Sequence, residues 1–294
     1  MSYFHLNLIL KGKLTVCCLL MLPAIPLNAQ REAKQIGDFK ESISLNEHLR
    51  GTKRTLQYRP DGDEFVCVNG KNRYTRALYG SHSPFRVETS DRPVFAFYNN
   101  GRGGNISFKV ILRDGTELAL DCTGHCESRY SAGKRTYYLT DPSWGKGELR
   151  ISVLALADMD GAIWRFSPSN MPKGAILRWQ HGGATGKRLS RNGDMGVDPA
   201  DCFELPVEAT DLVTGELSLQ KEVYLVRGEV PEGYNVRKLY QQAEAASLAL
   251  ASHLKIETPD PYLNTLGGAL VAAADGIWDG QVWLHGAIGW RMPL

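Results

Sequence analysis

The chain has 294 residues, of which 43% are hydrophobic, and it carries 34 Lys and Arg against 32 Asp and Glu. The two surplus positive charges, Lys11 and Lys13, lie in the first 29 residues, which contain no acidic residue, so the rest of the chain is neutral. Neutrality argues against a nucleic-acid partner and against strong attraction to an anionic membrane. The length suffices for one large β domain or for two smaller domains.

Residues 1–29 have the layout of a signal peptide. Two lysines precede the apolar run Leu14 to Leu22, and small residues follow at Asn28-Ala29. The run is too short to span a bilayer as a stable helix, so we predict its removal after Ala29. Neither Val16 nor Cys17 is the small residue that a lipoprotein signal places before its cysteine, and no later segment resembles a membrane span. The sequence therefore predicts a soluble exported protein, periplasmic or secreted.

Residues 30–60 are charged and weakly patterned, and we interpret them as a leader segment. Between 61 and 230, short runs of β-branched and aromatic residues are separated by turn pairs such as Asp114-Gly115 and Asp160-Gly161, which predicts antiparallel strands. The absence of a long helical stretch among them predicts a mainly β domain, an antiparallel β-sandwich of two sheets. GRGGN (101–105) is expected to form a glycine-rich turn and WQHGGATGKR (179–188) a mobile loop.

The pattern changes to helical spacing near residue 231. Residues 231–257 are predicted to form a linker helix, with Asn235 as its N-cap and Leu254 as its last residue, and the start of a short connector. A second helix follows in 258–294, capped by Asp260 and with Pro261 at its first position. The expected buried face of this second helix is Tyr262, Leu263, Leu266, Ala269, Leu270 and Ala273. Such an apolar stripe needs packing partners, because isolated helices are marginal in water.

The motif CTGHC leaves three interpretations open for Cys122 and Cys126. In an oxidising compartment the two could form a disulfide, since three intervening residues can turn back on themselves. They could equally be free thiols, or they could bind zinc together with His125. No second paired-ligand motif accompanies them, so we predict no metal site and no cofactor.

Two long stretches carry a family resemblance. FVCVNGKNRYTRALYGSHSPFRVETSDRPVFAFY (65–98), followed by GRGGNISFKV, closely resembles a family of exported Bacteroidota proteins known as domain of unknown function 4450. The resemblance implies a β-sandwich followed by a helical (α/α) toroid, whose beginning is similar to residues 258–294. It also implies a role among polysaccharide-utilisation enzymes acting on plant glycans, including a lyase at a rhamnose linked to glucuronic acid. Family members continue far beyond the segment matching GWRMPL, so we expect this chain to be truncated, with an incomplete toroid.

Several side chains are candidates for sugar binding or catalysis. Trp278, Trp283 and Trp290 offer flat faces on which sugar rings stack, unless they simply pack the first toroid helix. Arg73 and Arg76 in KNRYTRALYG are candidates for binding an acidic sugar, or for bridging the sheet to the next domain. The weak catalytic candidates are His285 and Arg291, as the base and the carboxylate-binding cation of a lyase. Asp275 and Asp279 are expected to be capping or solvated acids.

Two functions follow from these patterns. The first is the N-terminal accessory β-sandwich of an exported carbohydrate-active enzyme, a glycoside hydrolase or polysaccharide lyase acting on complex plant polysaccharide, inactive by itself. The second is an autonomous carbohydrate-binding β-sandwich module. A row of exposed aromatic side chains on one sheet face would favour the second. No nucleophile motif in the sandwich indicates a self-sufficient enzyme.

Overall fold

The structure is a computed structural model that describes residues 7–10, 57–83, 85–99, 102–188 and 212–283. The elements that follow Tyr58 belong to one compact unit. The strands are β1 (Asn7–Leu10), β2 (Arg59–Asp61), β3 (Glu64–Val68), β4 (Arg76–Leu78), β5 (Arg86–Thr89), β6 (Phe95–Asn99), β7 (Arg102–Ile111), β8 (Glu117–Ala119), β9 (His125–Ser131), β10 (Lys134–Thr140), β11 (Glu148–Ala155), β12 (Gly161–Ser169), β13 (Ile176–Arg188), β14 (Val213–Ser218), β15 (Val223–Gly228) and β16 (Leu254–Glu257). The helices are η1 (Leu120–Cys122), η2 (Pro142–Trp144), α3 (Val236–Ala251) and α4 (Pro261–Gly276).

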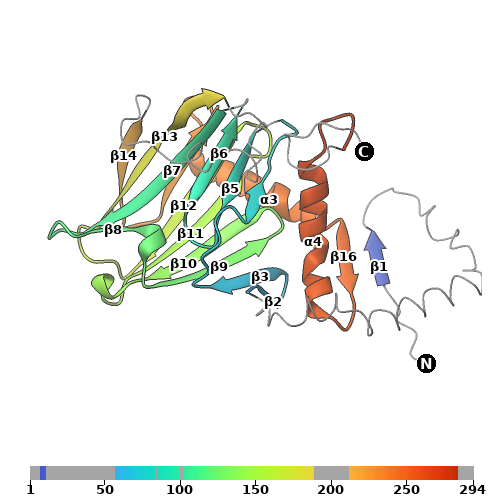
Figure 1. Cartoon of the computed structure of the whole chain (residues 1–294), viewed down its shortest axis with the longest axis horizontal. Helices are drawn as coiled ribbons and strands as arrows, with labels where there is room; N and C mark the ends of the chain where they lie inside the picture. The colour runs from blue at the N-terminus through green and yellow to red at the C-terminus, as the bar shows by residue number, and fades with distance from the viewer. Residues whose placement is uncertain (1–6, 11–56, 84, 100–101, 189–211, 284–294) are drawn as a thin grey trace, which may run out of the picture. The chain divides into compact units, whose positions relative to one another are not determined.

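Two seven-stranded sheets make up most of this unit (Figure 1). The first sheet has the order β15-β12-β11-β10-β9-β3-β2, and the second has β14-β13-β7-β6-β5-β4 with β8 paired to β7. Neighbouring strands in both sheets run antiparallel. A separate two-stranded sheet joins β1 and β16. The prediction of a mainly β fold with two antiparallel sheets is therefore confirmed.

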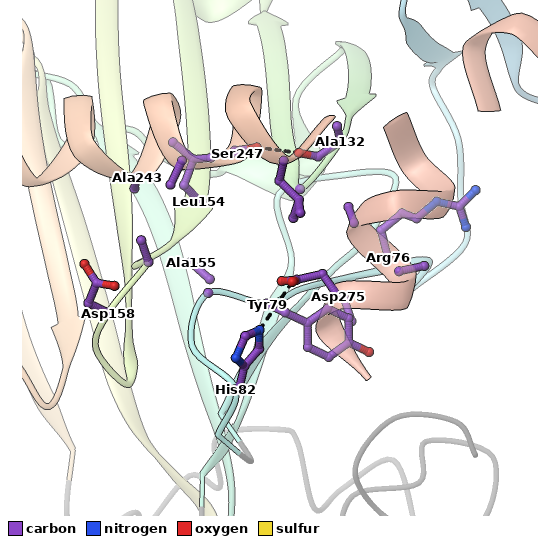
Figure 2. Close-up of a pocket in the computed structure, with 18 of the residues that line it drawn as sticks. Arg76, Tyr79, His82, Ala132, Leu154, Ala155, Asp158, Ala243, Ser247 and Asp275 are labelled. Atoms are coloured by element: carbon purple, nitrogen blue, oxygen red, sulfur yellow. Dashed lines mark hydrogen bonds and ion pairs between the residues drawn. The ribbon is translucent and has the colours of Figure 1, made fainter. Parts of the chain in front are cut away.

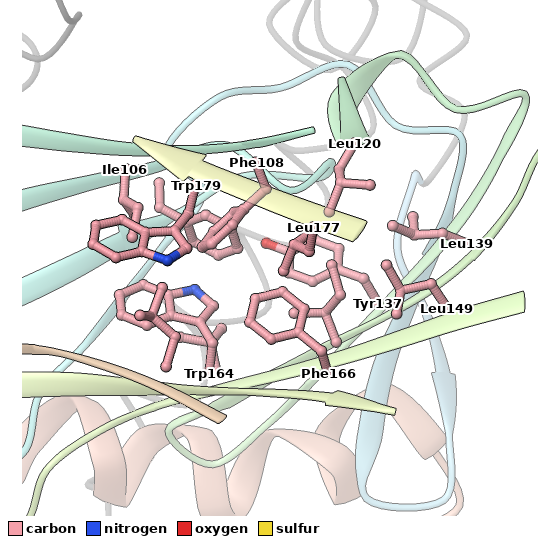
Figure 3. Packing of buried hydrophobic residues seen from close by; sticks show 14 of the residues in the cluster. Ile106, Phe108, Leu120, Tyr137, Leu139, Leu149, Trp164, Phe166, Leu177 and Trp179 are labelled. Carbon is pink, nitrogen blue, oxygen red and sulfur yellow. The ribbon is translucent and has the colours of Figure 1, made fainter. Parts of the chain in front are cut away.

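The two sheets enclose one hydrophobic core. Alternate residues of β7, namely Ile106, Phe108 and Val110, point inward as their spacing predicted, and Trp164 of β12 meets them from the first sheet. Figure 3 shows this packing of aromatic and aliphatic side chains between the layers. Trp164 makes edge-on ring contacts with Phe95 and Phe97, an arrangement that aromatic quadrupoles favour.

A second, smaller cluster lies on the outer face of the first sheet. Leu154 and Ile163 of β11 and β12 pack there against Leu239, Tyr240 and Ala243 of α3. Strand β11 follows the alternation that its sequence, ELRISVLA, predicts: Leu149, Ile151 and Val153 enter the core between the sheets. Only Leu154 provides an apolar side chain on the opposite face, and it packs against α3.

Both α-helices begin at the predicted caps. Asn235 accepts a hydrogen bond from the Lys238 amide at 3.0 Å, and Asp260 accepts one from the Tyr262 amide at 2.8 Å. The first helix ends at Ala251, three residues before the predicted end at Leu254, and residues 254–257, where the predicted connector begins, form strand β16. The backbone of β16 lies against α4, so these residues are held as a strand by a tertiary contact.

The buried face of α4 differs from the predicted one. Thr265, Gly267 and Ala272 are buried, whereas Leu263 and Leu270 are 46% and 45% exposed. A side chain at position 267 would approach the Leu254 carbonyl oxygen at 3.0 Å, so close packing against β16 favours glycine there. The small residues therefore face inward, and the two leucines are exposed on α4, as Leu248 is on α3.

Both glycine-rich segments are strands rather than a turn and a loop. Residues 102–105 belong to β7, and β13 continues through Gly182 and Gly183 to Arg188. Gly183 pairs with Gly104, and the register shifts between Gly183 and Arg188. The predictions for GRGGN and WQHGGATGKR were wrong because cross-strand pairing between β7 and β13 outweighs the low strand propensity of glycine. No α-helix in the described part of the chain is long and apolar enough to cross a membrane.

Candidate functional site

A cavity of about 470 Å³ lies between the edge of the sandwich and the two α-helices (Figure 2). One wall comes from β4 and the loop that follows it, and another from the β9–β10 turn and the end of β11. Helices α3 and α4 close the remaining sides. The volume is within the range of small-molecule sites, which are usually concave, preformed and located between packed layers. We call this space the interlayer cavity.

Small side chains keep the interlayer cavity open. Its lining includes Ala77, Gly80, Ala132, Gly133, Ala155, Ala157, Ala243, Ala246, Ala272 and Ala273. The alanines of α3 and α4 in this lining have short side chains, and they leave the cavity between the helices and the sandwich unfilled. Ser247 donates a hydrogen bond to the Ala132 carbonyl, which fixes α3 against the β9–β10 turn on one side of the cavity. Gly80 has no room for a Cβ atom, which would lie 1.7 Å from the Leu156 carbonyl oxygen.

The rim of the cavity is polar. His82, in the loop after β4, lies 3.3 Å from Asp275 in the last turn of α4, measured from Nε2 to Oδ1. The two side chains are 47% and 35% exposed, so the pair is open to ligand and solvent. Arg76 and Asp158 also line the cavity. This set combines a cation, two carboxylates and an imidazole, and can donate and accept hydrogen bonds with a polyhydroxylated ligand.

Tyr79 supports the end of α4. Its ring occupies the space beside Gly276, where an added Cβ would lie 2.2 Å from the ring carbons. Burial raises the pKa of Tyr79 to about 12, so the phenol stays protonated at neutral pH. The contact between Tyr79 and Gly276 holds Asp275 within reach of His82 (Figure 2).

The loop that carries His82 is fixed by its neighbours. Ser81 donates to Asp160 at 2.8 Å, and Ser83 also donates to Asp160. Asp160 belongs to the β11–β12 turn, so this turn and the loop are joined across 77 or more residues of sequence. Since both serine hydroxyls bind a carboxylate in a structural turn, we assign them a positioning role for His82.

The predicted sugar-binding residues have different locations in the structure. Arg76 lines the interlayer cavity, whereas Arg73 lines a separate cavity described below. Trp278 and Trp283 follow α4 and form an isolated bridge, with their ring centroids 4.6 Å apart. Trp283 is 53% exposed, so one indole face remains open beyond its contact with Trp278. Trp290, His285 and Arg291 lie outside the described residues.

Asp275 and Asp279 serve different purposes. Asp279 accepts hydrogen bonds from the backbone amides of Gln281 and Val282 at 2.9 and 2.8 Å, as expected of a capping acid. Asp275 instead meets His82 at the rim of the cavity. The sequence provided no signal for His82, because the contact joins residues 193 positions apart and no local spacing encodes it.

Of the three interpretations left open for Cys122 and Cys126, the structure has free thiols and not the candidate disulfide. Both are free thiols in the structure, as is Cys67. Cys126 lies on β9 with its side chain in the core, where its Sγ is 3.6 Å from the Asp91 carbonyl oxygen, whereas Cys122 is exposed at the end of η1. Opposite orientations of the two side chains thus separate the thiols. Among the described residues, no group of three or more His, Cys, Asp or Glu side chains is arranged to hold a metal ion.

Cys122 and Cys126 are expected to react with a thiol reagent at different rates in the native chain. Burial raises the pKa of Cys126 to about 12 and shields its thiol from the reagent. At pH 8, iodoacetamide should therefore modify Cys122 at least about tenfold faster than Cys126. Peptide mass spectrometry over a time course gives both rates. In guanidinium chloride the two rates should converge. Recovery of a peptide linked through Cys122 and Cys126 would contradict the assignment of free thiols.

The fold and the cavity define a two-sheet antiparallel β-sandwich with a ligand-sized space beside two flanking helices. Within it, residues 100–232 match the family model described as Domain of unknown function (DUF4450). The match spans β7 to β15, so most of the sandwich is similar to that family, in agreement with the resemblance noted from the sequence. No curated protein was found to match the chain.

Proposed function

We propose that this chain is the accessory β-sandwich portion of an exported carbohydrate-active enzyme, and that it binds plant oligosaccharide in the interlayer cavity. The observation that carries the proposal is the cavity itself, with its walls of small residues and its rim of Arg76, His82 and Asp275. Sugars present many hydroxyl groups and weakly apolar ring faces. A space with alanine walls and convergent charged groups meets both needs.

The exposed leucines of the two helices support the accessory role. Leu263 and Leu270 of α4 are nearly half exposed, and Leu248 of α3 is 60% exposed. Large apolar side chains exposed to solvent are typical of a surface that packs against another protein layer when they form a patch. In our proposal that layer is the helical toroid implied by the family resemblance, and it carries the hydrolase or lyase chemistry.

The alternative of an autonomous binding module has weaker support. Flat-surface sugar-binding modules need a row of aromatic side chains on one sheet face. The exposed aromatic side chains among the described residues are Tyr138 on β10, Tyr234 before α3 and Trp283 after α4, which do not form such a row. The cavity therefore remains the better candidate for sugar binding.

Filling the interlayer cavity is expected to abolish this binding. Ala246 is an exposed lining residue on α3, so Ala246→Phe places a ring in the cavity without disturbing the core. Calorimetric titration of the full chain with a panel of plant cell-wall oligosaccharides should then show at least about a tenfold weaker affinity, or about 1.4 kcal/mol. The matched control is Ala249→Phe, an exposed position on the same helix outside the lining. Equal affinities for the two variants, or no binding by the unmodified chain, would contradict the proposal.

A further inference from the structure

A second cavity, of about 540 Å³, lies where the β3–β4 loop approaches the outer face of β7. It shares no lining residue with the interlayer cavity. Its charged lining residues are Lys71, Arg73, Arg92, Lys109 and Asp121. Lys109 forms an ion pair with Glu117 at 3.5 Å, so three further cations face one lining carboxylate. The chain beyond residue 29 is neutral overall, which makes this local excess of positive charge distinctive. We call this space the basic cavity.

The loop that supplies Lys71 and Arg73 is held rigidly. Asp91, which is fully buried, accepts a hydrogen bond from the Asn72 amide at 2.9 Å, and its own amide donates to the Asn72 carbonyl at 2.9 Å. Two residues later, the Tyr74 amide donates to Ser90 Oγ at 2.8 Å. The backbone of an anchored loop has little entropy left to lose when a ligand binds, so Lys71 and Arg73 extend from a fixed position beside the cavity.

Arg92 is anchored in the same way, and by neutral groups. Its Nη1 donates to the carbonyl oxygens of Asp121 and Thr123 at 3.0 and 2.8 Å, and its Nη2 donates to Asn69 Oδ1 at 3.3 Å. Within the described part of the chain, these hydrogen bonds fix the guanidinium without placing a carboxylate against it. Its positive charge thus contributes to the potential of the basic cavity.

The remaining lining indicates a sugar rather than a bare anion. Pro93, Val94 and Ala119 provide apolar surface, and Asn105 and Ser107 of β7 provide an amide and a hydroxyl. Asn105 is almost fully buried, which places a polar group at the base of the cavity. Apolar surface, neutral hydrogen-bonding groups and cations together suit a pyranose ring that carries a carboxylate. The volume accommodates one or two such rings.

We propose that the basic cavity binds an acidic saccharide, with Lys71 and Arg73 as carboxylate-binding residues and Arg92 adding to the positive potential. Charge-assisted hydrogen bonds from Lys or Arg to a carboxylate are about twice as strong as neutral ones. The cavity thereby distinguishes uronate-bearing chains from neutral ones. The choice of a saccharide rests on the proposed function, whereas the preference for an anion rests on the charges alone.

The test compares two disaccharides that differ only in their carboxylates. The full chain is titrated calorimetrically with digalacturonate and with its neutral counterpart, α-1,4-galactobiose. We expect digalacturonate to bind at least about tenfold tighter, because hydrogen bonds from a cation to a carboxylate are stronger than those to a neutral group. Raising the salt concentration from 50 to 200 mM should weaken the binding of digalacturonate and leave that of galactobiose nearly unchanged.

The variant Lys71→Ala/Arg73→Ala is expected to lose at least about tenfold in digalacturonate affinity. Lys146→Ala removes an exposed lysine outside the cavity and is the matched control. Equal affinity for the two disaccharides, the same affinity in the double variant as in the control, or no binding at all would overturn the proposal. Inorganic phosphate binding as tightly as digalacturonate would overturn the assignment of a saccharide. The interlayer variant Ala246→Phe should leave digalacturonate binding at this cavity intact, so failures of the two proposals are distinguishable.

Discussion

Replacing Trp164 with alanine is expected to lower the free energy of unfolding by about 3–5 kcal/mol. The indole is fully buried in the centre of the sandwich (Figure 3). Its ring centroid lies 5.6–6.0 Å from those of Phe95, Phe97 and Phe108. Truncation removes the apolar contacts and leaves a void between two sheets whose separation is set by many other side chains. The sheets cannot collapse to fill it, so the cavity cost adds to the lost burial.

Equilibrium unfolding of the full chain in urea measures this effect. A loss of that size is a large fraction of the stability of an ordinary domain. The control is Tyr234→Ala, which truncates an aromatic ring that is 48% exposed before α3 and is expected to change stability by less than about 1 kcal/mol. If both variants unfold at the same denaturant concentration as the unmodified chain, Trp164 is not at the centre of the core.

Replacing Asp91 with alanine is expected to lower the free energy of unfolding by about 3–5 kcal/mol, because it leaves a buried guanidinium without its carboxylate partner. Asp91 and Arg135 are both almost completely buried, with Oδ1 and Nη2 3.5 Å apart. The same carboxylate accepts hydrogen bonds from the Tyr58 hydroxyl and from the Asn72 amide. Its removal therefore leaves an uncompensated charge and also releases the loop that shapes the basic cavity.

A double-mutant cycle with Arg135→Met separates these contributions. Arg135→Met alone should lower the free energy of unfolding by several kcal/mol. The destabilisation of the double variant should be smaller than the sum of the two single destabilisations, since the double variant leaves no unpaired charge. Urea unfolding gives all four stabilities. Strict additivity would show that the two side chains do not interact. Asp91→Ala should in addition weaken digalacturonate binding, because Asn72 loses its anchor.

The sequence predicted the elements whose signals are local. Alternating Ile106, Phe108 and Val110 identified a strand with one buried face, and Asp160-Gly161 identified the turn between β11 and β12. The helix starts at Asn235 and Asp260 were predicted from capping chemistry, which depends on a few consecutive residues. Each of these features is determined by side chains within one turn or one strand of each other.

The incorrect predictions all involve groups far apart in the sequence. The inward face of α4 depends on how closely Gly267 approaches β16, and periodicity alone placed Leu263 and Leu270 inside. Glycine-rich residues 182–188 extend a strand because β7 pairs with them. For Cys122 and Cys126 the sequence left a disulfide, free thiols and zinc binding open, and the fold has free thiols because only Cys126 belongs to a strand with an inward face.

A neutral chain with a mainly β body and two following helices could be predicted from the sequence, because composition, alternation and capping are properties of neighbouring residues. Tertiary structure alone decided where the empty spaces lie and which side chains surround them. Arg73 and Arg76 are three residues apart, yet they line different cavities, and His82 meets Asp275 only after α4 has packed against the sandwich. Cavities form where small residues from distant elements face one another, and no local sequence pattern predicts which distant elements will be neighbours.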